Sequence, residues 1–104
     1  MNLNEGLNWK KIGSVTGTNK LKLPNEWKEL YLEVDESTTY GVSGSALVLH
    51  YRSVGIHCGV NSQGAIASTH VVMSETNKEL NMLRAYQGSG SLDLSKITLT
   101  AYYR

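Results

Sequence analysis

The clearest pattern along the chain is an alternation of apolar and polar residues with a period of two. Leucine or valine occupies every second position from Leu30 to Val34, and in residues 97–103 Ile97, Leu99, Ala101 and Tyr103 alternate with Thr98, Thr100 and Tyr102. Successive side chains of a strand point to opposite faces, so each segment predicts a strand with one buried and one wet face. Further apolar runs between glycine, serine or asparagine clusters predict strands over residues 9–15, 20–23, 46–51, 54–60, 65–73 and 79–86.

Two segments need a choice between structures. Residues 9–23 predict a hairpin around Thr16-Gly17-Thr18-Asn19, because glycine and asparagine favour tight turns. Residues 74–86 could form a helix capped by Ser74, but the alternation at Leu80 and Met82 favours a strand that follows a turn at residues 75–78.

The spacing of these segments predicts the fold class. About eight short strands at intervals near ten residues, with no convincing helix, are typical of an antiparallel β-sandwich or a jelly-roll-like barrel. We therefore expect an all-β protein. Residues 9–104 are predicted to form a single β-sandwich domain, and residues 1–8 an N-terminal lead-in.

Composition excludes several classes of function. The chain has 104 residues, of which 18% are charged, and a formal net charge of +1. This balance argues against a disordered charged tail and against a broad basic surface for nucleic acid. No apolar run approaches the ~20 residues of a membrane helix, and the N-terminal residues lack the basic and apolar regions of a signal peptide. We expect no nucleic-acid partner, no membrane insertion and no signal peptide.

The histidines and the cysteine are the natural candidates for metal binding and thiol chemistry. Cys58 has no second cysteine to pair with, and it is most simply a small buried hydrophobe. His57 and Cys58 are adjacent, so a strand directs them to opposite faces. His50, His57 and His70 could meet only in three dimensions, because their spacing is not that of a structural zinc site. The pattern predicts no metal and no cofactor.

Other catalytic patterns are equally weak. The run Gly41-Val42-Ser43-Gly44-Ser45 lacks the spacing of a nucleophile elbow, and it is interpreted as a turn. Glu29 and Glu33 share the solvent face of a strand, where carboxylates aid solubility, so they do not indicate a glycosidase pair. We predict no catalytic residues and a protein that is not an enzyme.

Aromatic residues carry the strongest hint of function. The chain has two tryptophans, six tyrosines and no phenylalanine, a bias that suits half-exposed surfaces that bind a partner. The alternative is that tyrosine is simply common on strands. We expect Trp9, Trp27 and Tyr103 to pack in or at the rim of the core. Tyr31 is a further surface candidate, and the predicted binding residues are Tyr40, Tyr51, Tyr86 and Tyr102.

Three motifs in order carry a resemblance to a known group of proteins. They are residues 9–18 (WKKIGSVTGT), Leu23-Pro24 followed by residues 29–34 (ELYLEV), and residues 99–104 (LTAYYR). From residue 9 to residue 104 the chain resembles the small β-domains of phage and prophage tail-fibre, baseplate-associated or other virion structural proteins. The resemblance implies a virion structural or receptor-binding module that works as an oligomer such as a trimer, and it transfers no catalytic residue.

The leading hypothesis is therefore a non-enzymatic phage structural or receptor-binding module that acts through surface binding and oligomerisation. Its expected partners are further copies of itself, other virion proteins, and a glycan or protein of the host surface. Its expected location is the virion, or the bacterial cytoplasm before assembly. The alternative is a carbohydrate-binding module of a secreted or cell-surface protein, which should show two exposed aromatic rings in one coplanar row. A small hydrolase would need a histidine close to Cys58, a serine or a carboxylate.

Overall fold

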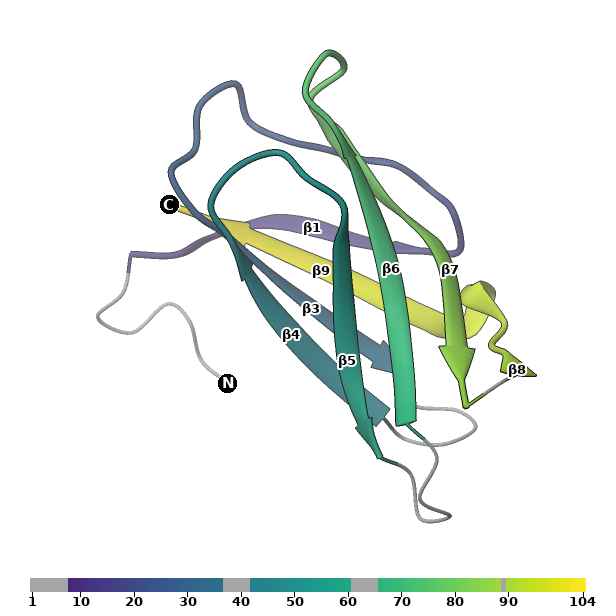
Figure 1. The fold of residues 1–104 in the computed structure, drawn as a ribbon. Coiled ribbons are helices and arrows are strands. Elements are labelled where there is room, and N and C mark those ends of the chain that lie inside the picture. Colours follow the sequence, from purple (N-terminus) through teal and green to yellow (C-terminus); the bar gives the residue numbers. More distant parts are fainter. Residues whose placement is uncertain (1–7, 37–41, 61–65, 89) are drawn as a thin grey trace.

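A computed structural model describes residues 8–36, 42–60, 66–88 and 90–104, and these residues lie mostly in β-strands (Figure 1). In chain order the strands are β1 (Lys10–Thr16), β2 (Leu21–Lys22), β3 (Leu30–Glu36), β4 (Val42–Val48), β5 (Val54–Val60), β6 (Ile66–Ser74), β7 (Glu79–Gln87), β8 (Gly90–Ser91) and β9 (Ile97–Tyr103). A short 3-10 helix, η1 (Leu94–Lys96), precedes β9. Within the described ranges no helix is long and apolar enough to cross a membrane.

The strands form two antiparallel sheets that pack against each other. The first sheet has the order β1-β9-β3-β4, and the second has the order β2-β7-β6-β5 with β8 paired to β7. Figure 1 shows the strands of the second sheet crossing those of the first. The predicted all-β fold, an antiparallel sandwich, is confirmed.

The period-two alternation places the core between the sheets. In β3, Leu30, Leu32 and Val34 are buried, whereas Tyr31 and Glu33 on the opposite face are partly exposed. Each large apolar side chain buried in this way stabilises the fold by roughly 1.5–3 kcal/mol. The core cluster comprises Leu23, Leu30, Leu32, Val34, Val48, Ile56, Cys58, Ala67, Val71, Leu80, Met82, Ala85, Ile97, Leu99 and Ala101.

At one edge of the sandwich, β4 and β5 come into direct backbone contact. A Cβ atom built on Gly44 would overlap the carbonyl oxygen of His57 and would lie 2.9 Å from the Cα of Cys58. Only glycine fits at this position without a shift of one strand. The interpretation of residues 41–45 as a turn is therefore wrong, because Val42–Val48 is a strand and Gly44 serves close packing.

The predicted hairpin of residues 9–23 is also wrong. β1 pairs with β9 and β2 pairs with β7, so the two segments belong to different sheets. The turn between them is present, with Gly17 in the left-handed region at φ 62°. The amide of Gly17 donates to the carbonyl of Leu94 at 3.0 Å, which ties the crossing to the residues before β9. Alternation alone cannot tell pairing within a hairpin from pairing with a distant strand.

The choice between helix and strand for residues 74–86 is settled in favour of the strand. β6 and β7 form a hairpin whose turn is closed by Asn77, which donates its amide to the hydroxyl of Ser74 at 3.1 Å. Lys78 takes a left-handed φ of 53° in this turn. Both ends of β4 differ from the predicted strand of residues 46–51, since β4 begins at Val42 and ends at Val48, so that Leu49 to Tyr51 leave the sheet. β8 and η1 are short elements that the pattern did not predict.

Candidate functional site

Three connections meet at one end of the sandwich, at the top of Figure 1, and enclose a hollow. They are the β2–β3 segment, the β4–β5 segment and the β6–β7 turn. The hollow has a volume of about 510 Å³, within the roughly 300–1,000 Å³ of small-molecule sites. We call it the loop-end pocket; it is lined by Asn25, Glu26, Trp27, Leu49, His50, Tyr51, Glu75 and Lys78.

An aromatic pair fixes one wall of the loop-end pocket. The ring centroids of Trp27 and Tyr51 lie 5.2 Å apart with 62° between the ring planes, an edge-to-face contact. The indole nitrogen of Trp27 donates a hydrogen bond to the Tyr51 hydroxyl at 3.3 Å. Edge-to-face pairs contribute about 0.5–1.5 kcal/mol beyond their buried area. Both rings are half-buried and pack on the core, so each holds the other in one orientation.

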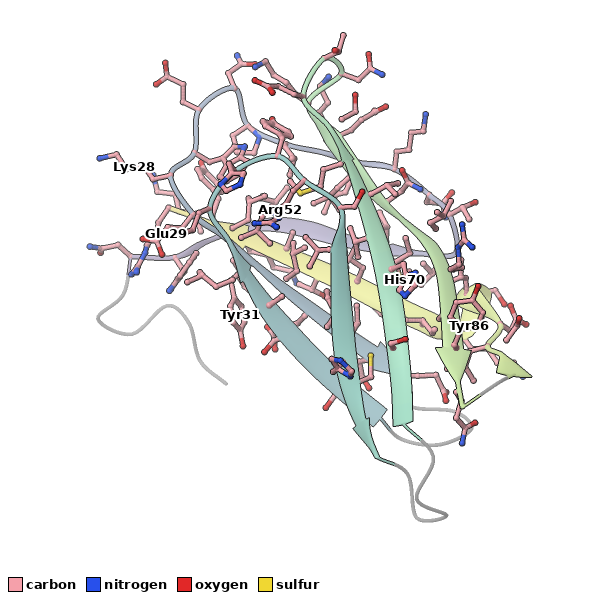
Figure 2. The ribbon with its side chains drawn as sticks, in the orientation of Figure 1. Lys28, Glu29, Tyr31, Arg52, His70 and Tyr86 are labelled. Atoms are coloured by element: carbon pink, nitrogen blue, oxygen red, sulfur yellow. The ribbon has the colours of Figure 1, made fainter. Side chains whose placement is uncertain are left out.

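Backbone hydrogen bonds hold the connections around the pocket in place. The amide of Leu23 donates to the carbonyl of Lys78 at 2.7 Å, which links the end of β2 to the β6–β7 turn. The amides of Lys28 and Glu29 both donate to the carbonyl of Arg104, at 2.8 and 2.9 Å. Figure 2 labels Lys28 and Glu29 at this end of the fold. A site anchored in this way loses little conformational freedom when it binds a ligand.

The polar rim of the loop-end pocket can both donate and accept hydrogen bonds. Glu26 and Glu75 supply carboxylate oxygens, Asn25 supplies an amide, and Lys78 supplies an ammonium group. Side chains of this kind around aromatic rings suit a ligand that has apolar faces and many hydroxyl groups.

The predicted binding residues do not form one surface. Tyr51 lines the loop-end pocket. Tyr102 lies on the outer face of the first sheet, and Tyr86 on the outer face of the second, where Figure 2 labels it. Tyr40 lies outside the described residues. The pocket also contains Trp27, which the sequence placed at the rim of the core, where it does pack.

The carboxylates of the pocket were missed for a topological reason. Glu75 belongs to the predicted turn of residues 75–78, and Glu26 lies in the connection between β2 and β3. That two turns about fifty residues apart close the same pocket follows from the pairing of β2 with β7, which no local pattern reveals.

A second aromatic group lies on the outer face of the first sheet. Tyr31 and Tyr102 are direct partners in the register of β3 and β9, with centroids 6.3 Å apart and planes tilted by 46°. Trp9 continues this row at 6.0 Å from Tyr31. On the other side of Tyr31 lies its β4 partner Leu47, which is 55% exposed. We call the surface formed by Tyr31, Glu33, Leu47 and Tyr102 the tyrosine face.

The tyrosine face has its own electrostatics. Partial burial raises the pKa of the Tyr102 phenol above its usual value of 10.0, and the charge of Glu33 and a hydrogen bond to it raise that pKa further. The phenol is therefore protonated at neutral pH. Beside it is a hollow of about 370 Å³, bordered by Tyr31, Glu33, Asp35, Ser43 and Ser45 among others.

Cys58 does not have the surroundings of a nucleophile. Its side chain is buried, as predicted, and its sulfur donates to the carbonyl of Ile56 at 3.5 Å and lies 3.5 Å from the Thr69 hydroxyl. Burial raises the pKa of the thiol above its usual value of 9.0 and outweighs the hydrogen bonds with Thr69. His57, the residue before Cys58, is exposed on the other face of β5. In the described part of the chain, no three or more His, Cys, Asp or Glu side chains are grouped to hold a metal ion.

A comparison of the chain with protein-family models, with curated proteins and with solved structures found no match.

Proposed function

We propose that the protein is a non-enzymatic binding module of the kind carried by phage tail fibres, and that it binds a saccharide of the host surface in the loop-end pocket. The observation that carries the proposal is the Trp27–Tyr51 pair on the wall of a 510 Å³ hollow formed by anchored connections. Loops held on a rigid β-scaffold are a common place for recognition, because the scaffold keeps their geometry.

A saccharide fits the chemistry of the pocket. Tryptophan and tyrosine offer apolar ring faces with a polar tip, which match the carbon–hydrogen faces of a pyranose. Glu26 and Glu75 accept hydrogen bonds from sugar hydroxyls, and Lys78 donates to sugar oxygens. A binding role also agrees with the buried, protonated thiol of Cys58, which makes nucleophilic catalysis by this residue unfavourable.

The phage setting of the proposal is carried by the resemblance of residues 9–18, 29–34 and 99–104 to small virion β-domains. Such modules act in several copies, and the tyrosine face is the surface through which we propose that copies associate. Leu47 and Leu49 are 55% and 61% exposed on or beside this face. Exposed leucines next to tyrosines are typical of an interface rather than of a surface in contact with water.

The alternative, a carbohydrate-binding module of a secreted or cell-surface protein, has a different geometric requirement. Such a module would place two exposed rings in one plane to stack along a sugar chain. The aromatic pairs among the described residues are tilted by 46° to 67°. This geometry favours a pocket for a terminal or internal sugar over a flat platform for a polysaccharide, so we rank the alternative second.

Tryptophan fluorescence tests the proposal directly. In a Trp9→Phe background, Trp27 is the remaining tryptophan, and its emission reports on the loop-end pocket. Titration with the saccharides that score on a glycan array should change this emission, with an affinity in the micromolar to millimolar range. The variants Glu26→Gln and Glu75→Gln should each weaken binding about tenfold, the loss of one hydrogen bond to a charged group.

The matched control is Glu33→Gln, which makes the same chemical change on the tyrosine face. This variant should leave saccharide affinity unchanged. If Glu33→Gln weakens binding as much as Glu26→Gln does, the saccharide site lies on the tyrosine face. A glycan array without a signal would contradict saccharide binding.

The association of copies is tested separately by sedimentation, in which Leu47→Asp should shift the protein to monomers. A wild-type protein that stays monomeric at high concentration would contradict that part.

A further inference from the structure

The outer face of the second sheet contains a local irregularity that brings a leucine and an arginine to the surface side by side. The register between β6 and β7 shifts between His70 and Val71, because His70 pairs with Arg84 and Val71 pairs with Met82. Leu83 is the extra residue of a β-bulge. Leu83 and Arg84 are both exposed as a result, and Leu83 has 43% of its surface accessible. Bulges often redirect side chains next to binding sites.

Arg84 belongs to an ordered group of side chains. Its guanidinium donates a hydrogen bond to the Tyr86 hydroxyl at 3.4 Å. The ring of Tyr86 meets the ring of His70 edge to face, with centroids 5.6 Å apart. Figure 2 shows His70 and Tyr86 on neighbouring strands of this sheet. The contact with Tyr86 uses one of the five donors of the guanidinium, which leaves others to bind a second acceptor.

The strands around Arg84 carry little negative charge. Among residues 54–60, 66–74 and 79–87 the one acidic residue is Glu79, and it forms an ion pair with Lys20 at 3.5 Å at the far end of β7. Arg84 takes no part in this ion pair or in the Arg104–Glu29 pair, and among the described residues no carboxylate is seen to pair with it. A guanidinium without a carboxylate partner is suited to bind an external anion.

An apolar hollow lies beside His70, the register partner of Arg84. It has a volume of about 230 Å³ and is lined by Ser53, Val54, Gly55, His70, Val71, Val72 and Leu83. Gly55 is the β5 partner of His70, and a Cβ atom added there would come no closer than 3.9 Å to the imidazole. The glycine therefore leaves the space above His70 open. Arg84 supplies a cation, the His70–Tyr86 pair supplies aromatic rings, and the hollow supplies an apolar recess on the same face of the sheet.

We propose that Arg84, His70, Tyr86 and the recess formed with Leu83 and Gly55 are a second binding site, which takes an acidic sugar. The anionic group, a carboxylate or a sulfate, binds Arg84, and the apolar face of the sugar ring lies against Leu83. This site is on the outer face of the second sheet and uses none of the residues of the loop-end pocket. Binding at this second site can therefore be tested independently of saccharide binding in the loop-end pocket.

The test is a titration of the isotope-labelled full chain with small probes, followed by NMR. Methyl glucuronide and a sulfated glucose should both shift the methyl signals of Leu83 and the ring signals of His70, whereas methyl glucoside should shift neither. The two acidic probes distinguish carboxylate from sulfate as the preferred anion. Arg84→Gln should lower the affinity for the preferred probe about tenfold, the effect of losing one charge-assisted hydrogen bond. Lys11→Gln removes the same charge from β1 of the first sheet and should leave affinity unchanged.

Leu83→Ser separates the recess from the charge. It should weaken the acidic sugar but leave the weak binding of inorganic sulfate as it was. Equal losses in Arg84→Gln and Lys11→Gln would overturn the proposal, because they would mean attraction by net charge alone. Equal affinity for methyl glucuronide and methyl glucoside would overturn it as well. Self-association that Arg84→Gln abolishes, without any response to the sugars, would assign Arg84 to contacts between copies and contradict the sugar site. A response of Trp27 to neutral saccharides tests the loop-end pocket alone.

Discussion

The close contact between β4 and β5 leads to a sharp prediction for Gly44→Ala. The added methyl group would overlap the carbonyl oxygen of His57 and crowd the Cα of Cys58, which is 2.9 Å from the Cβ position. Both neighbours are backbone atoms of β5, so no flexible side chain can rotate away. One strand must move, and the packing of Val34 and Cys58 beside it must change with it.

The expected size follows from measured effects of overpacking. Extra methyl groups in a tight core typically cost about 1–3 kcal/mol, and rigid backbone neighbours place Gly44→Ala near the upper end, at about 3 kcal/mol. For a domain of this size that loss lowers the melting temperature by roughly 15 °C. Urea unfolding followed by circular dichroism measures the free energy directly, with an unchanged slope if the two states keep their compactness.

Gly55→Ala is the matched control. It makes the same substitution on β5, where the nearest atom is the His70 ring carbon at 3.9 Å, an ordinary contact distance. Alanine allows the backbone of the unfolded chain fewer conformations than glycine does, so this variant should be neutral or more stable by about 0.4–1 kcal/mol. If Gly44→Ala and Gly55→Ala unfold at the same urea concentration, the two strands do not touch as described and the reasoning fails.

Three further predictions follow from the core and its buried thiol. Leu32→Ala should destabilise the protein by about 2–5 kcal/mol in urea unfolding, because Leu32 is fully buried between the sheets; a loss below ~1 kcal/mol would contradict that burial. Cys58 should react with a disulfide reagent far more slowly in the native state than in urea, and equal rates would show that the thiol is accessible. Folding raises the pKa of Cys58, so the protonated thiol favours the folded state. This contribution to stability is complete below the pKa of the unfolded chain and is lost as pH rises above about 9. Wild type should therefore lose more stability than Cys58→Ala in this pH range.

The parts of the fold that a local pattern controls were predictable. Leu30, Leu32 and Val34 alternate with polar residues because one face of β3 is buried, and the same relation holds in β9. The same alternation predicts a strand over residues 79–86 in place of a capped helix, and β7 covers these residues. The errors concern pairing across the chain: β1 and β2 are adjacent in sequence, but each finds its partner about sixty residues or more away.

Gly44 and Leu83 show a second limit of sequence reasoning. A glycine between serines usually marks a turn, yet Gly44 is in a strand, where its missing side chain lets β5 approach. Leu83 has the polarity of a core residue, but it follows the buried Met82 and so lies on the outer face, and the one-residue bulge places Arg84 on that face beside it. In both cases the structural role of the residue depends on a neighbour from another strand. The residue type alone therefore does not predict that role until the pairing of the strands is known.

The same register explains why the tyrosines predicted to act together lie apart. Tyr86 and Tyr102 occupy the outer faces of opposite sheets, and a sandwich keeps such faces on opposite sides of the molecule. Tyr51 belongs to neither face, because it leaves β4 and packs on Trp27 at the loop end. Each tyrosine has instead acquired different neighbours: carboxylates and an indole around Tyr51, Glu33 beside Tyr102, and His70 with Arg84 beside Tyr86. These neighbours determine the chemistry of three separate surfaces, for which we propose a neutral sugar, another copy of the chain and an acidic sugar as partners.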